Sequence, residues 1–215
     1  MQTRIGSDRE EVHMANVKIG STTYTGVNTL ALINANTNGS VSFTEADDFM
    51  GIMAGGSDYD YYENSQLTNI SQWATHWFFS RFKTVYLPNV TTLAQNNANH
   101  LNCENFIAPK LTSVANQLTN GGAGKCKIVD IGALTEIGTY GFSGAGLTTI
   151  ILRGNTVPSC SYVNNQKAGV TVYVPSAMLS SYQADTTWQS LVSSKNWTLT
   201  ALEGSQYEDT DWFKS

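Results

Sequence analysis

A short apolar pattern that recurs at a nearly fixed step constrains this chain more than any other feature of its sequence. The clearest copy spans residues 147–157, with apolar residues at Leu147, Ile150, Leu152 and Val157 and an asparagine at position 155. A period of about 20–29 residues indicates a repeat architecture. Alignment on Ile150 places further copies, at steps of 21 or 22 residues, around Val85, Phe106, Ile128 and Val172.

A repeat of this length holds one short strand and one return segment, and it cannot bury its apolar side alone. Stacked repeats share a continuous core and a parallel sheet. Two columns are therefore expected to point inward: Val85, Phe106, Ile128, Ile150 and Val172, and then Leu87, Ala108, Leu152 and Val174. Asp130 falls in the second column as a polar exception, so it either has a partner inside or distorts its repeat.

Two further columns support the alignment. Pro88, Pro109 and Pro175 occupy the same position after their strands, where a residue without an N–H donor is tolerated. A second apolar column follows the strands, in which two apolar residues enclose two polar ones. Its members are Val90/Leu93, Leu111/Val114 and Leu134/Ile137, with a partial upstream copy at Leu67/Ile70.

The copy at residues 147–157 reads L-x-x-L-x-L-x-x-N-x-L with Ile and Val in two Leu positions, which is the leucine-rich-repeat signature. Residues 134–152, with Gly141 before Phe142, resemble one repeat of the BspA-like leucine-rich-repeat proteins of bacteria and their phages. The cysteine that this family often has near Ala145 is missing here. The segment from Val172 to Trp188 resembles the closing segment of such arrays. The resemblance covers roughly residues 67–200 and implies a scaffold for adhesion and display.

The expected fold is mainly β: a leucine-rich-repeat solenoid with short parallel strands, a small N-terminal β cap and a helical C-terminal cap. Residues 1–13 form a leader outside the fold, which is either a disordered segment or translated sequence upstream of a native start at Met14. Residues 14–50 form the N-terminal β region, 51–66 a linker loop, 67–175 the solenoid, and 176–215 the C-terminal cap and tail. The acidic tail, 204–215, is either disordered or a docking segment.

The N-terminal part carries three local predictions. Residues 17–27 resemble the start of some small phage structural proteins. Residues 71–82 predict a helix with a buried aromatic stripe. In the linker loop, Tyr59, Tyr61 and Tyr62 form a candidate contact loop, because tyrosine offers rigid amphipathic contact area. Calcium binding by the acids of this loop and a plain solvated loop are the alternatives.

The solvent side of the predicted sheet is the main candidate contact face. Its outward column is Tyr86, Ile107, Val129, Ile151 and Tyr173. An exposed apolar stripe of this kind often marks an interaction site. The alternatives are that β-branched residues merely stabilise the strands, or that the cap or a neighbouring subunit in a homo-oligomer covers them.

The sequence points to no catalytic, cofactor or metal site. Its three histidines lie in unrelated contexts, and its His and Cys residues lack the spacing of a zinc site. Cys103 and Cys126 are expected on adjacent repeats, as buried free thiols or as a disulfide. The formal net charge of −5 argues against nucleic acid, and no apolar run suggests membrane insertion.

Two functions remain after these exclusions. The first is a non-enzymatic phage virion accessory protein, a tail or capsid appendage assembled in the host cytoplasm, which binds other virion proteins or a host-surface protein or glycan. A secretory signal is not evident in the sequence, which favours this prediction. The second is a bacterial cell-surface adhesion module of the BspA-like type.

Overall fold

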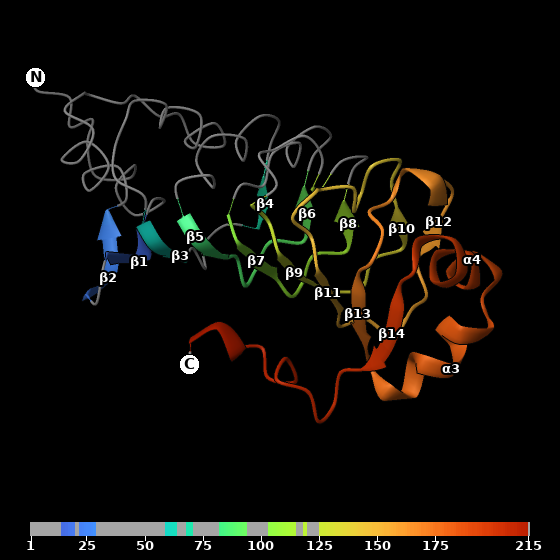
Figure 1. The fold of residues 1–215 in the computed structure, drawn as a ribbon. Coiled ribbons are helices and arrows are strands. Elements are labelled where there is room, and N and C mark those ends of the chain that lie inside the picture. Colours follow the sequence, from blue (N-terminus) through green and yellow to red (C-terminus); the bar gives the residue numbers. More distant parts are fainter. Residues whose placement is uncertain are drawn as a thin grey trace, which may run out of the picture.

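The computed structural model of the chain describes residues 14–19, 22–28, 59–63, 68–70, 82–93, 103–114, 118–119 and 125–214. Within these ranges the chain forms a β-solenoid, in which successive turns stack side by side along one long sheet (Figure 1). The predicted solenoid of short parallel strands is therefore confirmed. Within the described ranges, no helix is both long enough and apolar enough to cross a membrane.

The long sheet has the strand order β14-β13-β11-β9-β7-β5-β3-β1-β2 among the described residues. From β3 to β14 every neighbouring pair is parallel, whereas β1 pairs antiparallel with both β2 and β3. The strands are β1 (Met14–Ile19), β2 (Thr22–Asn28), β3 (Tyr59–Glu63), β5 (Phe82–Tyr86), β7 (Asn105–Ala108), β9 (Ile128–Ile131), β11 (Thr149–Leu152), β13 (Thr171–Val174) and β14 (Thr198–Ala201).

A second row of two-residue strands lies above the long sheet in Figure 1 and holds the second residue of each pair in the second apolar column. Leu93 of β6 is in register with Ile70 of β4 and with Val114 of β8, and Ile137 of β10 with Cys160 of β12. The solenoid thus has two parallel walls around one core. The bounds are β4 (Asn69–Ile70), β6 (Thr92–Leu93), β8 (Ser113–Val114), β10 (Glu136–Ile137) and β12 (Ser159–Cys160).

The sequence alignment is wrong by one residue in the third turn. Phe106 of β7 and Ile150 of β11 both pair with Val129, not with Ile128. The step from Phe106 to Val129 is 23 residues, one more than expected. Side chains alternate across a strand, so a slip of one residue exchanges the two faces. Val129 therefore points inward and Asp130 outward, which removes the polar exception from the core.

The core runs without interruption between the two walls. Its sheet side is one in-register column of side chains that are all 0% exposed: Val85, Phe106, Val129, Ile150 and Val172. The turns approach closely at their corners. A Cβ on Gly154 would lie 2.3 Å from the Ala133 Cα of the preceding turn, so only glycine fits there.

Two helices connect β13 to β14, the last strand of the long sheet: α3 (Ser176–Ala184) and α4 (Thr186–Lys195). Asp185 caps α4 by accepting hydrogen bonds from the Thr187 and Trp188 N–H groups, at 2.9 and 3.1 Å. The buried Trp188 ring lies between Tyr182 and Trp197, at centroid distances of 4.6 and 5.8 Å. Both helices therefore join the core at the C-terminal end of the solenoid.

The predictions for the N-terminal part of the chain have different outcomes. Residues 14–19 and 22–28 are strands, in line with the β pattern of that region. The predicted contact loop is wrong in its local structure, because Tyr59, Tyr61 and Tyr62 lie in strand β3. The leader 1–13 and residues 71–81 of the predicted helix lie outside the described residues, and Phe82 begins strand β5.

Candidate functional site

The side of the long sheet that faces away from the core carries the residues predicted from the sequence as a contact face, except that Asp130 takes the place of Val129. The register places Tyr86, Ile107, Asp130, Ile151 and Tyr173 in one outward column. Val129 does not belong to it, since that side chain is in the core. An aspartate thus lies near the middle of a row of apolar and aromatic side chains.

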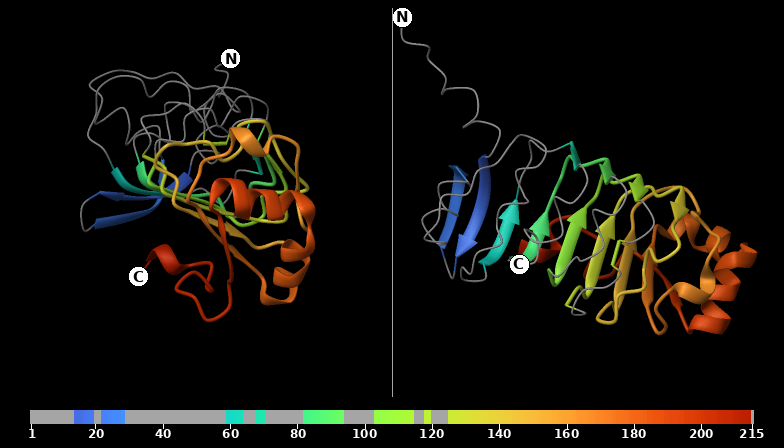
Figure 2. Two further views of the ribbon diagram at one scale, coloured as in Figure 1. Left: turned by 45° about the vertical axis from the view of Figure 1, so that its right-hand side comes forward. Right: turned by 90° about the horizontal axis from the view of Figure 1, so that it is seen from above.

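The C-terminal segment, residues 203–214, lies over this outward column. After β14 the chain turns back beneath the sheet and ends near β5, as two views show (Figures 1 and 2). The Tyr207 ring packs on Tyr173 at a centroid distance of 4.8 Å, and the Phe213 ring on Tyr86 at 4.9 Å. We call residues 203–214 the tail, and we call the outward column of residues that the tail covers the outer face. Of the two sequence expectations for the tail, the structure therefore shows docking, and the docking is within the same chain.

An ion pair forms the centre of the contact. Arg153 donates from Nε and Nη2 to the two carboxylate oxygens of Asp130, at 2.7 and 2.8 Å. The Asp130 side chain is fully buried, and that of Arg153 is 12% exposed. Such a paired, two-bond geometry is the strong form of an arginine–carboxylate contact. The attraction between the two opposite charges offsets the hydration that each side chain loses on burial.

The same guanidinium holds the tail by its backbone. Arg153 Nη1 donates to the Glu208 carbonyl at 3.0 Å, and Nη2 donates to the carbonyls of Tyr207 and Asp209 at 2.9 and 3.2 Å. Three successive carbonyls therefore converge on one side chain. Recognition through backbone carbonyls depends on the path of the bound segment more than on its side chains.

The indole of Trp212 completes the site. Its Nε1–H donates to Asp130 Oδ2 at 2.8 Å, so one carboxylate joins two turns of the solenoid to the tail. Burial raises the pKa of Asp130, while the hydrogen bonds from Arg153 and Trp212 oppose that rise. The Trp212 ring also packs edge-on between Tyr207 and Phe213, at 5.1 and 5.7 Å. The tail aromatics thus form a connected row.

The tail leaves the sheet through a short turn. Gly204 has a φ of +79°, a conformation that suits glycine, and its N–H donates to the Glu208 carboxylate at 2.8 Å. Glu203 accepts hydrogen bonds from the N–H and the hydroxyl of Ser176 at the start of α3. The Ser176 side chain therefore binds Glu203 and does not cap the helix. These contacts fix the direction in which the tail departs.

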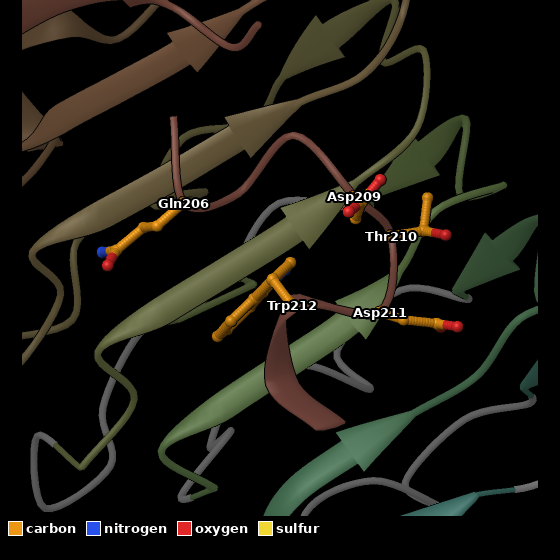
Figure 3. Close-up of a pocket in the computed structure, with 5 residues that line it drawn as sticks. All are labelled: Gln206, Asp209, Thr210, Asp211 and Trp212. Atoms are coloured by element: carbon orange, nitrogen blue, oxygen red, sulfur yellow. The ribbon is translucent and has the colours of Figure 1, made fainter. Parts of the chain in front are cut away.

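A hollow of about 470 Å³ opens at the tail and is lined by Gln206, Asp209, Thr210, Asp211 and Trp212 (Figure 3). Asp211 pairs with Lys214 at 3.2 Å. Within the described ranges, the structure contains no group of three or more His, Cys, Asp or Glu side chains that could hold a metal ion. The hollow is a polar surface feature beside the docked tail.

The two cysteines expected on adjacent turns do lie together. Cys103 and Cys126 are buried free thiols, and Cys126 Sγ donates to the Ile128 carbonyl at 3.8 Å. Burial raises the pKa of the Cys103 thiol well above its ordinary value, which favours the neutral form. They occupy a core position, apart from the outer face.

Two signals in the sequence could have indicated the tail contact. Trp212 and Phe213 are large aromatic residues in an otherwise acidic segment, and Arg153 stands in a column where other turns have proline. What the arrangement does is hold an extended segment by its carbonyls and its aromatic side chains.

Comparison of the chain with protein-family models, with curated proteins and with solved structures finds no significant match.

Proposed function

We propose that this chain is a non-enzymatic binding protein of the leucine-rich-repeat type, similar to BspA-like proteins, and that it serves as an accessory component of a phage virion. One observation carries the binding role. The outer face already holds a protein segment, the tail, across the turns from β13 back to β5. A surface that does this within one chain has the shape and chemistry to hold other protein segments.

The chemistry of the face fits this role. Aromatic and apolar side chains supply contact area, and the Arg153–Asp130 pair supplies direction through the carbonyls and the indole that it binds. Aromatic residues and arginine are the residue types that dominate the energetics of protein interfaces. Partners of the face would be other virion proteins or a host-surface protein or glycan.

The two ends of the solenoid suit an appendage. The antiparallel strands β1 and β2 would act as the N-terminal cap, and α3 and α4 as the helical C-terminal cap, since repeat arrays need closing units. The virion assignment rests on the resemblance of residues 17–27 to phage structural proteins and of residues 134–152 to BspA-like repeats.

Mass spectrometry of purified phage particles from the source culture tests the virion assignment. We expect the chain in the particles at a fixed copy number, with hundreds of copies indicating a head protein and a few copies a tail protein. Detection in the host envelope or the medium, with none in the particles, would reject the assignment. That result would favour the second candidate, a bacterial cell-surface adhesion module, for which the same resemblance to BspA-like repeats speaks.

A further inference from the structure

We infer that the outer face binds the tail of a second copy of this chain, so that two molecules are joined by exchange of their tails. The inference rests on the proposed binding role of the outer face and names its partner. It follows from three observations on the tail: how it is bound, how it is connected, and what an exchange would change.

First, the tail is held by side chains and not as a strand of the sheet. Its backbone hydrogen bonds are local, for example from the Ser205 N–H to the Leu202 carbonyl at 3.1 Å and from the Lys214 N–H to the Asp211 carbonyl at 2.8 Å. In the described part of the chain, no backbone hydrogen bond links residues 205–214 to a strand of the long sheet. The tail can therefore leave without breaking the ladder of the solenoid.

Second, the connection to the tail is short and contains the residue best suited to a change of path. Leu202 is fixed to the solenoid, because its N–H donates to the Val174 carbonyl at 2.8 Å. The first docked ring belongs to Tyr207. Between them, Gly204 at φ +79° makes the turn, and glycine reaches extended conformations as readily. Rotation at this hinge redirects the tail away from its own sheet.

Third, an exchanged tail makes every contact with the outer face that the docked tail makes now. The Arg153 bonds to three carbonyls depend on the path of the tail, and the Trp212 bond to Asp130 and the ring contacts with Tyr86 and Tyr173 depend on its side chains. None of them depends on which molecule supplies the tail. Only the hinge differs, and reciprocal exchange closes a two-fold dimer. The intramolecular tail competes at an effective concentration on the order of 1 mM, so exchange is favoured where copies are crowded.

Two full-length variants with complementary defects test the exchange. The donor carries Asp130→Ala with Arg153→Ala, which removes the polar centre of the outer face without leaving an unpaired buried charge and keeps the tail intact. The acceptor carries Trp212→Ala with Phe213→Ala, which weakens the tail and keeps the face. Analytical ultracentrifugation should show each variant alone as a monomer and an equimolar mixture as a one-to-one heterodimer.

A labelled peptide of residues 203–215 tests whether the outer face binds the tail at all, separately from whether two molecules exchange their tails. Fluorescence polarisation should show it binding the acceptor about tenfold or more tightly than the donor, and a peptide with both aromatic residues replaced by alanine should not bind. Circular dichroism confirms folding, and a donor with Tyr86→Ala and Tyr173→Ala replaces the first donor if that variant is unfolded.

The outcomes are distinct. Heterodimer formation supports docking of the tail on a second copy, through the one tail contact that this pair can form. Monomers in the mixture, together with peptide binding to the acceptor, would overturn exchange and leave the binding role of the face standing. Monomers without peptide binding would overturn both. The presence of the chain in phage particles is decided separately by mass spectrometry.

Discussion

The two faces of the long sheet are built from alternate residues of the same strands, yet they are covered in different ways. The inner face meets the opposite wall of the solenoid with two apolar side chains per turn, such as Val85 with Leu87 and Ile150 with Leu152. The outer face meets a single non-repetitive segment, and its neighbours in register range from Ile107 through Asp130 to Ile151. Periodic burial needs only a repeated residue type, whereas the outer contact needs particular residues at particular turns.

The two contacts also differ in their physical basis. The inner face depends on apolar burial and close packing, which do not depend on direction. The outer face adds one buried ion pair whose hydrogen bonds are directional and reach residues more than 50 positions away, from Arg153 to Tyr207 and from Asp130 to Trp212. Substitutions on the inner face should therefore unfold the solenoid, and substitutions on the outer face should release the tail.

The largest effect is expected from Val129→Asp. This change places an unpaired carboxylate in the core and should cost about 3–5 kcal/mol beyond the lost packing, because an uncompensated buried charge is strongly unfavourable. Urea unfolding followed by circular dichroism measures the loss. Val129→Ala is the matched control and should cost roughly 1–3 kcal/mol. A Val129→Asp protein as stable as the control would show that the register placing Val129 in the core is wrong.

The adjacent pair Ile150 and Ile151 compares the two faces directly, since both are 0% exposed. Ile150→Ala should cost about 2–5 kcal/mol of global stability, because it opens a cavity between the two walls. Ile151→Ala should cost less in urea unfolding, because the tail above it can move. Limited proteolysis should instead cleave the tail of the Ile151→Ala protein faster. Equal losses of global stability would mean that the tail is part of the cooperative core.

Arg153→Ala should undock the tail while the solenoid stays folded. It removes the bonds to three carbonyls and leaves Asp130 with fewer partners, which should cost about 2–3 kcal/mol of docking free energy. Amide hydrogen exchange in residues 205–214 should then accelerate about 30- to 150-fold, since 1.4 kcal/mol corresponds to a factor of ten. Arg153→Lys keeps the charge but not the forked geometry, so its hydrogen-exchange rate in the tail should lie between those of the unmodified protein and the Arg153→Ala protein. If amide hydrogen exchange were unchanged in the Arg153→Ala protein, Arg153 would not contribute to docking of the tail.

The smallest effect is expected from Glu203→Gln at the hinge. Hydrogen bonds from the Ser176 hydroxyl and N–H lower the pKa of Glu203 below its ordinary value of 4.5. Its contribution to stability is therefore complete above pH 4.5 and is lost as the pH falls through the lowered pKa. The melting temperatures of the two proteins should differ slightly at neutral pH and converge in acid. A difference that grew on acidification would contradict this account.

Much of the solenoid could be predicted from the spacing of apolar residues. Leu93 and Ile137 of the second apolar column lie in a second wall of short strands, which the spacing alone did not predict. The third turn failed because Ile128 and Val129 are both apolar, so spacing alone did not decide which of them points inward. Only pairing with Phe106 and Ile150 resolved that choice.

The sequence by itself determined that this chain forms a repeat with a continuous apolar core, because each turn carries the same local pattern and the pattern sets which side is buried. Only the tertiary structure decided what covers the outer face. The contacts of Arg153 and Asp130 with the tail join residues 54 to 82 positions apart and follow no period. Such a contact depends on the path of the chain after its last strand, and a local pattern carries no information about that path.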